Sequence, residues 1–348
     1  MAPIQNSRVI FNSIPEGYPV PGETLIIENE SIDLDNDPLG GGVLVQIVCI
    51  SVDPYLRSRM REPHVPSYAP AFTLHKPIHN HAVARVLRSE NADVKPGQHL
   101  YGWFDFAHYQ IVDAEGLKRM RILPEGSGVP WSVYVGVGGM PGQTAYYGWK
   151  ELEPKKARRH LSGETIYIST AAGPVGCTVM QLAKAAGLKV IASAGQETKL
   201  QFLRELGADV VFNYKTADLD DVLKEHAPLD IYWDHVGGKT LDTVLPRMKV
   251  HGRILIVGHM SSYNNAPDPV YNLDRFLALR IKMLGFLVID HDEKYSKEFY
   301  EVVPGKIARG ELKYNETVVR SLEEAPQLIL DVQQGNNFGK AVIVLADD

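Results

Sequence analysis

The sequence predicts an α/β protein that combines a doubly wound parallel sheet of the Rossmann type with a second, β-rich domain. Two patterns support this expectation. Residues 1–130 contain short apolar runs separated by proline and glycine, as in small irregular sheets. From residue 131 onward, strand-like runs alternate with helical patterns, as in parallel sheets built from right-handed crossovers.

In the first domain we expect strands at residues 43–48 and 82–87, and turns at residues 94–98 and 123–126. The second domain, residues 131–310, is expected to carry strands at residues 166–169, 190–193, 210–212, 231–233, 254–257 and 283–289. Its expected helices include residues 175–186, 198–206 and 294–309.

The tail, residues 311–348, returns to β character. We expect strands at residues 318–319 and 341–345, with a helix at residues 323–334 between them. A short basic run at residues 153–160 is interpreted as a solvated loop.

Length and composition limit the classes of function. With 348 residues, 45% of them hydrophobic and 22% charged, the chain is long enough for two domains. A net charge of −6 gives no reason to expect nucleic acid or an anionic membrane as a partner. No apolar leader or 18-residue apolar run is present, and Cys49 and Cys177 are too few for a disulfide framework. We therefore expect a cytoplasmic protein.

Two glycines lie where a dinucleotide-binding turn belongs, between a predicted strand and a predicted helix. Gly173 and Gly176 would let the backbone approach a pyrophosphate, whose charge would rest on the helix N-terminus. The first glycine of G-x-G-x-x-G is absent, because Thr170 or Ala171 stands in its region. The context of five further strand–helix units still favours a nucleotide cofactor.

The next strand indicates which nucleotide is bound. NAD-binding folds place an acidic residue at its end, whereas NADP requires that carboxylate to be absent and a cation to be near. Here the strand ends in Ser193-Ala194-Gly195, and Lys199 follows in the next helix. Tyr214, after the third strand, offers a hydroxyl for the same phosphate. The cofactor is predicted to be NADPH/NADP+.

Several motifs in order resemble a known group, the zinc-independent medium-chain dehydrogenases/reductases, in the leukotriene B4 dehydrogenase / prostaglandin reductase / alkenal double-bond reductase branch. The resemblance spans nearly the whole chain. The motifs that carry it are SVDPYLR at 51–57, MPGQTAY at 140–146, AGPVG at 172–176, SAG at 193–195, FNYK at 212–215, DHVGG at 234–238, SYN at 262–264, GFLV at 285–288 and GNNFGK at 335–340.

This resemblance implies a GroES-like domain built from both chain ends, a Rossmann domain, a homodimer, and reduction of a double bond conjugated to a carbonyl. The residues that it places in the site are Tyr263 over the substrate carbonyl, Tyr55 in the pocket, and Ala172, Gly173, Val175, Gly176, Gly195, Lys199, Tyr214, Phe286, Val288 and Asn337 at the cofactor. The chain departs from the family pattern at His235, where asparagine is usual, and at residues 78–82, which lack the usual glycines.

The chemistry requires a donor for the enolate oxygen that develops when a hydride reaches the β-carbon. A phenol donates a hydrogen bond without carrying charge. Tyr263 is our candidate, with the cofactor's ribose hydroxyl beside it, and Tyr55 is the alternative.

A catalytic metal is not expected, because zinc requires three protein ligands, typically Cys and His. Ser51 stands where such enzymes carry cysteine, and Cys49 is a poor substitute. We expect His79 and His81 to point to opposite faces of a strand, and read them, with His108, as surface or pocket-lining side chains.

Two alternatives to an alkenal or enone reductase remain at this point. One is an NADPH-dependent quinone reductase, and the other is a non-catalytic NADPH-binding module of the same fold. All three need the glycine turn, but only an enzyme needs Tyr263 and space for a substrate.

Overall fold

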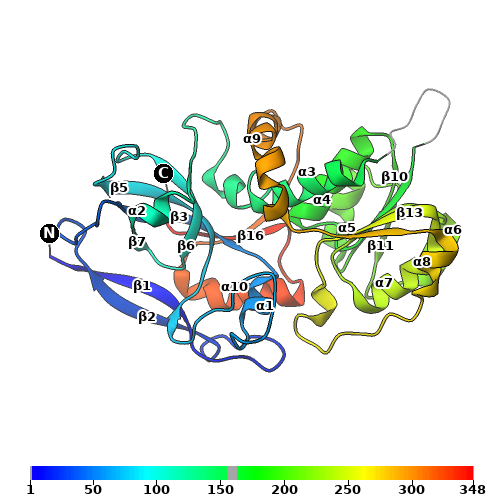
Figure 1. Cartoon of the computed structure of the whole chain (residues 1–348), viewed down its shortest axis with the longest axis horizontal. Helices are drawn as coiled ribbons and strands as arrows, with labels where there is room; N and C mark the ends of the chain where they lie inside the picture. Colours follow the sequence, from blue (N-terminus) through cyan, green and yellow to red (C-terminus); the bar gives the residue numbers. More distant parts are fainter. Residues whose placement is uncertain (1, 155–162, 348) are drawn as a thin grey trace. The chain divides into compact units, whose positions relative to one another are not determined.

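The structure is a computed structural model that describes residues 2–154 and 163–347 (Figure 1). Most of the basic run at residues 153–160 lies outside this range. The chain divides into two compact units: the first consists of Met1–Gly139 and Glu316–Asp348, and the second of Met140–Asn315. The sequence placed the boundaries after residues 130 and 310. The first boundary comes later because the 3₁₀ helix η1 (Trp131–Val135) packs on strands of the first unit.

The first unit is β-rich. Its described strands form a three-stranded sheet in the order β2-β1-β4 and a seven-stranded sheet in the order β15-β16-β3-β5-β6-β8, with β7 paired to β3. These strands are β1 (Ile4–Phe11), β2 (Leu25–Ile32), β3 (Val43–Val52), β4 (Lys76–Pro77), β5 (His79–Ser89), β6 (His99–Asp105), β7 (Tyr109–Val112), β8 (Arg121–Ile122), β15 (Glu316–Val319) and β16 (Lys340–Val344). Its helical segments are α1 (Leu56–Arg59), α2 (Ala114–Leu117), η1, η5 (Leu322–Glu324) and α10 (Ala325–Gln334).

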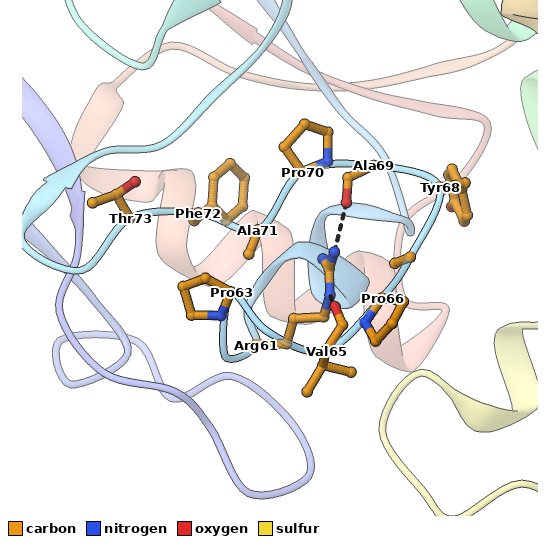
Figure 2. Close-up of a pocket in the computed structure, with 11 residues that line it drawn as sticks. Arg61, Pro63, Val65, Pro66, Tyr68, Ala69, Pro70, Ala71, Phe72 and Thr73 are labelled. Atoms are coloured by element: carbon orange, nitrogen blue, oxygen red, sulfur yellow. Dashed lines mark hydrogen bonds between the residues drawn. The ribbon is translucent and has the colours of Figure 1, made fainter.

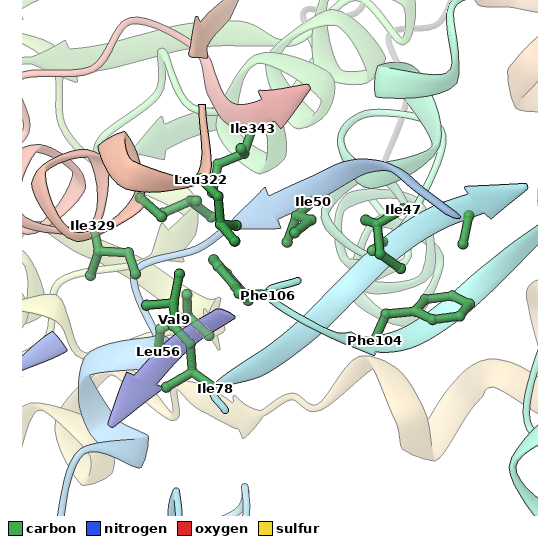
Figure 3. Packing of buried hydrophobic residues seen from close by; sticks show 14 of the residues in the cluster. Val9, Ile47, Ile50, Leu56, Ile78, Phe104, Phe106, Leu322, Ile329 and Ile343 are labelled. Carbon is green, nitrogen blue, oxygen red and sulfur yellow. The ribbon is translucent and has the colours of Figure 1, made fainter. Parts of the chain in front are cut away.

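The two ends of the chain meet in this unit. Strand β16 pairs antiparallel with β3, with Ala341 opposite Val52 and Val344 opposite Cys49. Apolar side chains of the sheet and of α10 form one core, in which Ile50, Phe104 and Ile329 are fully buried (Figure 3). Burial of this apolar surface is the main stabilising contribution, and it fixes the ends of β3 and β16 side by side.

The second unit has the predicted doubly wound sheet. Its six described strands are all parallel and follow the order β11-β10-β9-β12-β13-β14. They are β9 (Thr165–Ile168), β10 (Lys189–Ala194), β11 (Val210–Asn213), β12 (Leu229–Asp234), β13 (Met248–Ile256) and β14 (Lys282–Gly285). The helical segments are α3 (Met140–Leu152), α4 (Pro174–Ala185), α5 (Glu197–Glu205), α6 (Leu219–His226), α7 (Gly238–Val244), η2 (Leu245–Arg247), η3 (Met260–Ser262), α8 (Asp274–Leu279), η4 (Val288–His291) and α9 (Asp292–Ala308).

The order of the strands reverses at β9, which lies between β10 and β12. In such sheets, ligands bind at the carboxyl ends of the strands beside this switch point. The turns that leave β9, β10 and β12 therefore locate the site.

One expected strand is shorter than the sequence suggested. The run at residues 283–289 continues as a strand only to Gly285, because Phe286 N donates the last ladder bond to Ile256 O at 3.0 Å. Val288–His291 then forms a 3₁₀ turn. An apolar run does not reveal by itself where its hydrogen-bond ladder with the neighbouring strand ends.

In the parts of the chain that the structure describes, no helix has the length and apolar character needed to cross a membrane.

Candidate active site

The glycine turn connects β9 to α4. Thr170, in the region where the first glycine of the motif is absent, adopts a left-handed conformation with φ of 47°, which glycine usually supplies. A Cβ on Gly176 would lie 2.6 Å from Ala171 Cα, so this position requires glycine for close packing. A Cβ on Gly173 would meet, among described atoms, only Thr170 O at 3.8 Å. The turn is therefore tight at Gly176 and open at Gly173.

Gly173 is the N-cap of α4, and Pro174 occupies the first helical position. Among the described residues no side chain caps this helix, and the first N–H groups of a helix lack intrahelical acceptors. The backbone of Val175 and Gly176 belongs to this first turn, while Ala172 is buried beneath it. This end of α4 fits the pyrophosphate of a dinucleotide.

Beside this turn, β10 ends at Ala194 and leads through Gly195 to α5. A Cβ on Gly195 would come within 2.8 Å of Tyr214 Oη and 3.0 Å of Lys215 Cε. Burial lowers the pKa of Lys199, and the positive charge of Lys215 lowers it further. Two cations and a phenol thus gather where no acid ends the strand, which fits a ribose 2′-phosphate. Sequence reasoning missed Lys215, although it directly follows Tyr214.

The third turn, after β12, is organised by Asp234. Its Oδ1 accepts hydrogen bonds from Tyr232 Oη at 2.7 Å and from the N–H groups of Val236 and Gly237 at 2.8 and 2.9 Å. Burial raises the pKa of Asp234, and its Oδ2 has no hydrogen-bond partner among the described residues. The carboxyl group thus stabilises the turn that follows β12, through its hydrogen bonds from the two backbone N–H groups.

His235, the first departure from the family pattern, is fixed inside the protein. Its Nδ1 lies 2.6 Å from Ser169 O, which can only accept, so Nδ1 carries the proton. Its Nε2 then accepts from Trp233 Nε1 at 3.2 Å. Burial lowers the pKa of His235 to about 4. The imidazole is therefore a neutral link between the ends of β9 and β12.

Tyr263 lies at the same edge of the sheet. Met260 N donates to His235 O at 3.0 Å and Ser261 N to Val236 O at 3.1 Å, which ties η3 to the turn after β12. Tyr263 follows η3 directly and is buried, and its ring meets that of His259 edge to face at 4.8 Å. The phenol thus has a defined place near the carboxyl ends of the strands.

The segment after β14 lies at the carboxyl edge of the same parallel sheet. Phe286 is buried, and its ring stacks on His291 at 4.8 Å. Val288 begins η4 and is half-buried. The structure places Phe286 beside the end of β13, since Phe286 N donates to Ile256 O at 3.0 Å.

Tyr55 belongs to the first unit, where it precedes α1. Its hydroxyl donates to Asn80 Oδ1, and Asn80 Nδ2 donates to Ser51 O and to Asp53 Oδ2, both at 2.9 Å. Lys340 Nζ lies 3.1 Å from Asp53 Oδ1, and the two side chains are 3% and 6% exposed. We name these five residues, Ser51, Asp53, Tyr55, Asn80 and Lys340, the buried polar network.

Two charges stabilise each other inside this network. Burial alone would raise the pKa of Asp53, but the charge of Lys340 and hydrogen bonds from Ser51 and Asn80 outweigh it and lower that pKa. Asp53 is therefore ionised at neutral pH. No local sequence pattern indicates this network, because Lys340 comes from β16.

Asn337, the remaining candidate of the first unit, is half-buried in the loop before β16. Its Nδ2 donates to Gly339 O at 2.8 Å. The other candidates for cofactor contact, with Tyr263, are on the second unit, where the structure brings them to the ends of neighbouring strands.

The expectation that His79 and His81 point to opposite faces of a strand is wrong. Residues two apart share a face, and both rings lie near Trp103, at 5.5 and 5.0 Å. His79 Nε2 lies 2.6 Å from Arg59 Nη2, which can only donate, so its lone pair is occupied. Both histidines, like His108, are half-buried. Within residues 2–154 and 163–347, no three Cys, His, Asp or Glu side chains are grouped as metal ligands.

A pocket of about 480 Å³ lies in the first unit along the loop from Arg61 to Thr73. Figure 2 shows Arg61 on its wall, where the guanidinium donates to Val65 O at 2.9 Å and to Ala69 O at 2.8 Å. Pro63, Pro66, Pro70, Tyr68 and Phe72 are among the other residues that line it.

Known proteins resemble this chain over its full length. A family model described as "Zinc-binding dehydrogenase" matches residues 174–304, and one described as "N-terminal domain of oxidoreductase" matches residues 7–120. The NADP(+)-dependent 2-alkenal reductase of Nicotiana tabacum is 38% identical over 99% of this chain and 98% of its own. The (+)-pulegone reductase of Mentha piperita is 35% identical over 99% of both chains.

A solved structure agrees with these relatives. CurA from Vibrio vulnificus in complex with NADPH is 31% identical and has a TM-score of 0.88, covering 98% of this chain and 100% of its own. The sequence motifs, the parallel sheet with its glycine turn and these full-length matches agree, and the chain belongs to the zinc-independent medium-chain dehydrogenase/reductase family.

Proposed function

We propose that this protein is an NADPH-dependent ene reductase, which reduces the carbon–carbon double bond of α,β-unsaturated aldehydes or ketones. The observation that carries the proposal is a buried, uncharged phenol, Tyr263, held at the same sheet edge as the glycine turn. The full-length similarity to a 2-alkenal reductase and a pulegone reductase supports the same reaction class.

The cofactor-binding residues follow from the fit described above. The N-terminus of α4, with Gly173 and Gly176, receives the pyrophosphate. Lys199, Tyr214 and Lys215 receive the 2′-phosphate, whose negative charge offsets the mutual repulsion of the two lysines. Phe286 and Val288 line the nicotinamide end, and Asn337 is a further candidate for cofactor contact.

When bound, NADPH supplies a hydride for the β-carbon of the substrate. The protein's part is to stabilise the charge that develops on the carbonyl oxygen as the enolate forms. Tyr263 donates a hydrogen bond from its phenolic hydroxyl to that oxygen. A proton from solvent then completes reduction at the α-carbon.

The direct test is to measure NADPH consumption against enals, enones, quinones and saturated alcohols at matched concentrations. We expect turnover of enals and enones, insensitive to metal chelators, with the saturated carbonyl compound as product. Turnover of quinones alone would favour a quinone reductase, and NADPH binding without turnover would favour a binding module. If the purified protein held about one zinc ion per chain and lost its activity when that zinc was removed, a metal-free site would be contradicted.

We further propose that the protein is a homodimer joined through β14. This strand is at the edge of the sheet, and among the described residues its outer side pairs with no other strand. Its four residues are all exposed, among them Met283 and Leu284. On α8, Leu277 is 84% exposed. Natural proteins rarely leave such an edge open.

A second copy is the partner that these features favour, because a two-fold axis lets one edge strand pair with itself. Leu284→Lys combined with Leu277→Lys should convert the dimer to a monomer, measured by light scattering after size exclusion. Val250→Lys, at another exposed apolar residue, is the matched control. A wild-type protein that is monomeric at micromolar concentration would overturn this assembly.

The two cysteines, both free and buried, support a cytoplasmic location, which a fluorescent fusion would test.

A further inference from the structure

The segment that follows β14, residues 286–291, buries little of its own side-chain surface. Phe286 is its one buried residue, whereas Leu287 and Ile289 are 36% and 77% exposed. The backbone is tied to the sheet at the start of the segment, where Phe286 N donates to Ile256 O at 3.0 Å. Burial within this chain therefore does little to fix the rest of the segment, and side-chain contacts at its ends become important.

One such contact joins the two ends of the segment. The rings of Phe286 and His291 are nearly parallel, with an angle of 11° between their planes and 4.8 Å between their centroids. Aromatic rings favour this kind of offset stacking. The stack closes residues 286–291 into a loop, so the place of the Phe286 ring depends on what holds His291.

His291 is held by side chains of α9 and α3. Its ring stacks on that of Tyr295, with centroids 6.4 Å apart, and its Nδ1 lies 3.5 Å from Glu151 Oε1. Tyr295 Oη donates to the same oxygen at 2.6 Å. Hydrogen bonds from Lys294 and Tyr295 lower the pKa of Glu151, so the carboxylate is ionised at neutral pH. The imidazole thus lies between Phe286 and a fixed group on α3.

Helix α3 contributes its contacts from one face. Gln143, Tyr147 and Glu151 are spaced by four residues and are therefore neighbours along the helix. Gln143 Nε2 and Tyr147 Oη both donate to Asp292 Oδ1, at 3.1 and 3.0 Å. Tyr147 is fully buried. These bonds fix the residue that follows His291, so α3 defines where the loop 286–291 ends.

We propose that His291 is a positioning residue for the nicotinamide half of NADPH, because its ring holds Phe286 and the residues after it in place. The inference rests on the proposed function, in which Phe286 and Val288 line the nicotinamide end, and deepens it. His291 acts through Phe286. The stacked ring, and not the longer polar contact with Glu151, carries the effect.

The experiment compares two ligands that differ in the nicotinamide. NADPH and 2′-phosphoadenosine 5′-diphosphoribose both carry the adenosine, the pyrophosphate and the 2′-phosphate, but only NADPH carries the nicotinamide ring. Titration calorimetry in the absence of substrate gives both dissociation constants. We expect the wild-type protein to bind NADPH more tightly than the truncated compound, because the segment 286–288 contributes only to NADPH.

Three substitutions of His291 separate its two contacts. His291→Ala removes both and should weaken NADPH binding about three- to tenfold, as expected for the loss of one aromatic pair. Binding of the truncated compound should not change. His291→Phe keeps a ring that can stack and should bind NADPH within about twofold of the wild-type protein. His291→Gln keeps an N–H donor for Glu151 without the ring and should resemble His291→Ala.

The matched control lies on the same two helices. Glu298 on α9 pairs with Lys150 and accepts from Tyr146 Oη at 2.8 Å, and both partners belong to α3. Glu298→Ala removes these contacts between α3 and α9 without touching the stack, and should leave both dissociation constants unchanged.

Amide hydrogen exchange of the free protein provides a second measurement. Exchange reports local opening of the backbone. His291→Ala and His291→Gln should speed exchange in residues 287–291 and leave β10 as in the wild-type protein, whereas His291→Phe should restore the slower exchange.

Unchanged NADPH affinity or unchanged exchange in His291→Ala would overturn the inference. Equal weakening of both ligands would do so as well, since it would indicate a general disturbance of the fold. So would a His291→Phe variant as weak as His291→Ala, or a wild-type protein that binds both ligands equally. These measurements use no substrate. A protein that shows the expected binding pattern but reduces no enal or enone would contradict the proposed function alone.

Discussion

The cofactor turn of the second unit and the buried polar network of the first unit are both at strand ends, but they are built differently. The turn is one contiguous stretch, residues 170–176, whose shape is set by backbone conformation and close backbone packing. The network joins residues from β3, β5 and β16, far apart in the sequence. A backbone site can be recognised from local sequence, whereas a side-chain network depends on which strands become neighbours.

The two departures from the family pattern show the same contrast. His235 replaces an asparagine in the second unit, and its imidazole is used entirely by Ser169 and Trp233 within the sheet. Asn80 in the first unit reaches the hydroxyl of a candidate site residue. One substitution thus stabilises the fold locally, while the other alters what a neighbouring side chain can do.

The largest effect is expected from the ion pair of the network. Lys340→Met leaves Asp53 buried without its counter-charge, and breaking such a pair costs about 3–5 kcal/mol. Urea denaturation at pH 7 should show this loss in the free energy of unfolding. Lys340→Met combined with Asp53→Asn should recover most of it. Lys224→Met, in an exposed pair with Asp220, should cause no measurable change, and an equally stable Lys340→Met variant would contradict the buried pair.

The next effect concerns the donor in the second unit. Tyr263→Phe keeps the ring but removes the hydroxyl, and losing the main donor to an oxyanion typically costs about 10²–10³ in turnover. We expect the lower end or less on enones, because the cofactor's ribose hydroxyl shares the load, with NADPH affinity maintained. Steady-state kinetics with saturating NADPH measures this. If the Tyr263→Phe variant kept wild-type turnover on every accepted enone, Tyr263 would only line the pocket and would not be a donor to the enolate.

Cofactor preference is expected to change through Lys199. A charge-assisted hydrogen bond contributes about 1.5–3 kcal/mol, so Lys199→Ala should raise KM for NADPH roughly tenfold or more. KM for NADH, which lacks the 2′-phosphate, should change little. Lys215→Ala gives the comparison for the second cation. Equal losses with both cofactors would refute contact of Lys199 with the 2′-phosphate.

Features encoded by contiguous residues could be predicted from the sequence, whereas contacts between distant residues could not. The parallel sheet, the glycine turn and NADP(H) as cofactor were readable, because each is encoded by contiguous residues or by alternating strands and helices. The end of β14 at Gly285 was not, since it depends on Phe286 pairing with Ile256. Neither was the network, because no local pattern pairs Lys340 with Asp53 or turns Asn80 toward Tyr55.

The smallest effect tests whether His235 is the neutral link described above. Burial lowers its pKa to about 4, against about 6.5 in an unfolded chain. Above pH 6.5 both states are neutral and there is no cost. Between pH 6.5 and 4 the unfolded chain binds a proton at this residue that the folded protein does not bind. The free energy of unfolding therefore decreases as the pH is lowered, by about 1 kcal/mol from pH 7 to pH 5.5 for this residue.

The variant His235→Asn, which restores the residue usual in the family, removes that proton while leaving His79 and His81, whose pKa values burial also lowers to about 4. Urea unfolding curves at pH 7.0 and 5.5 should therefore show a pH-dependent loss that is smaller than in the wild-type protein by about 1 kcal/mol. Any change at pH 7.0 reports only the lost hydrogen bonds to Ser169 and Trp233. Equal losses in the two proteins would mean that His235 gains its proton as readily in the folded protein as in the unfolded chain. The imidazole would then not be held between Ser169 O and Trp233 Nε1, and the link between β9 and β12 would have to come from the strand pairing alone.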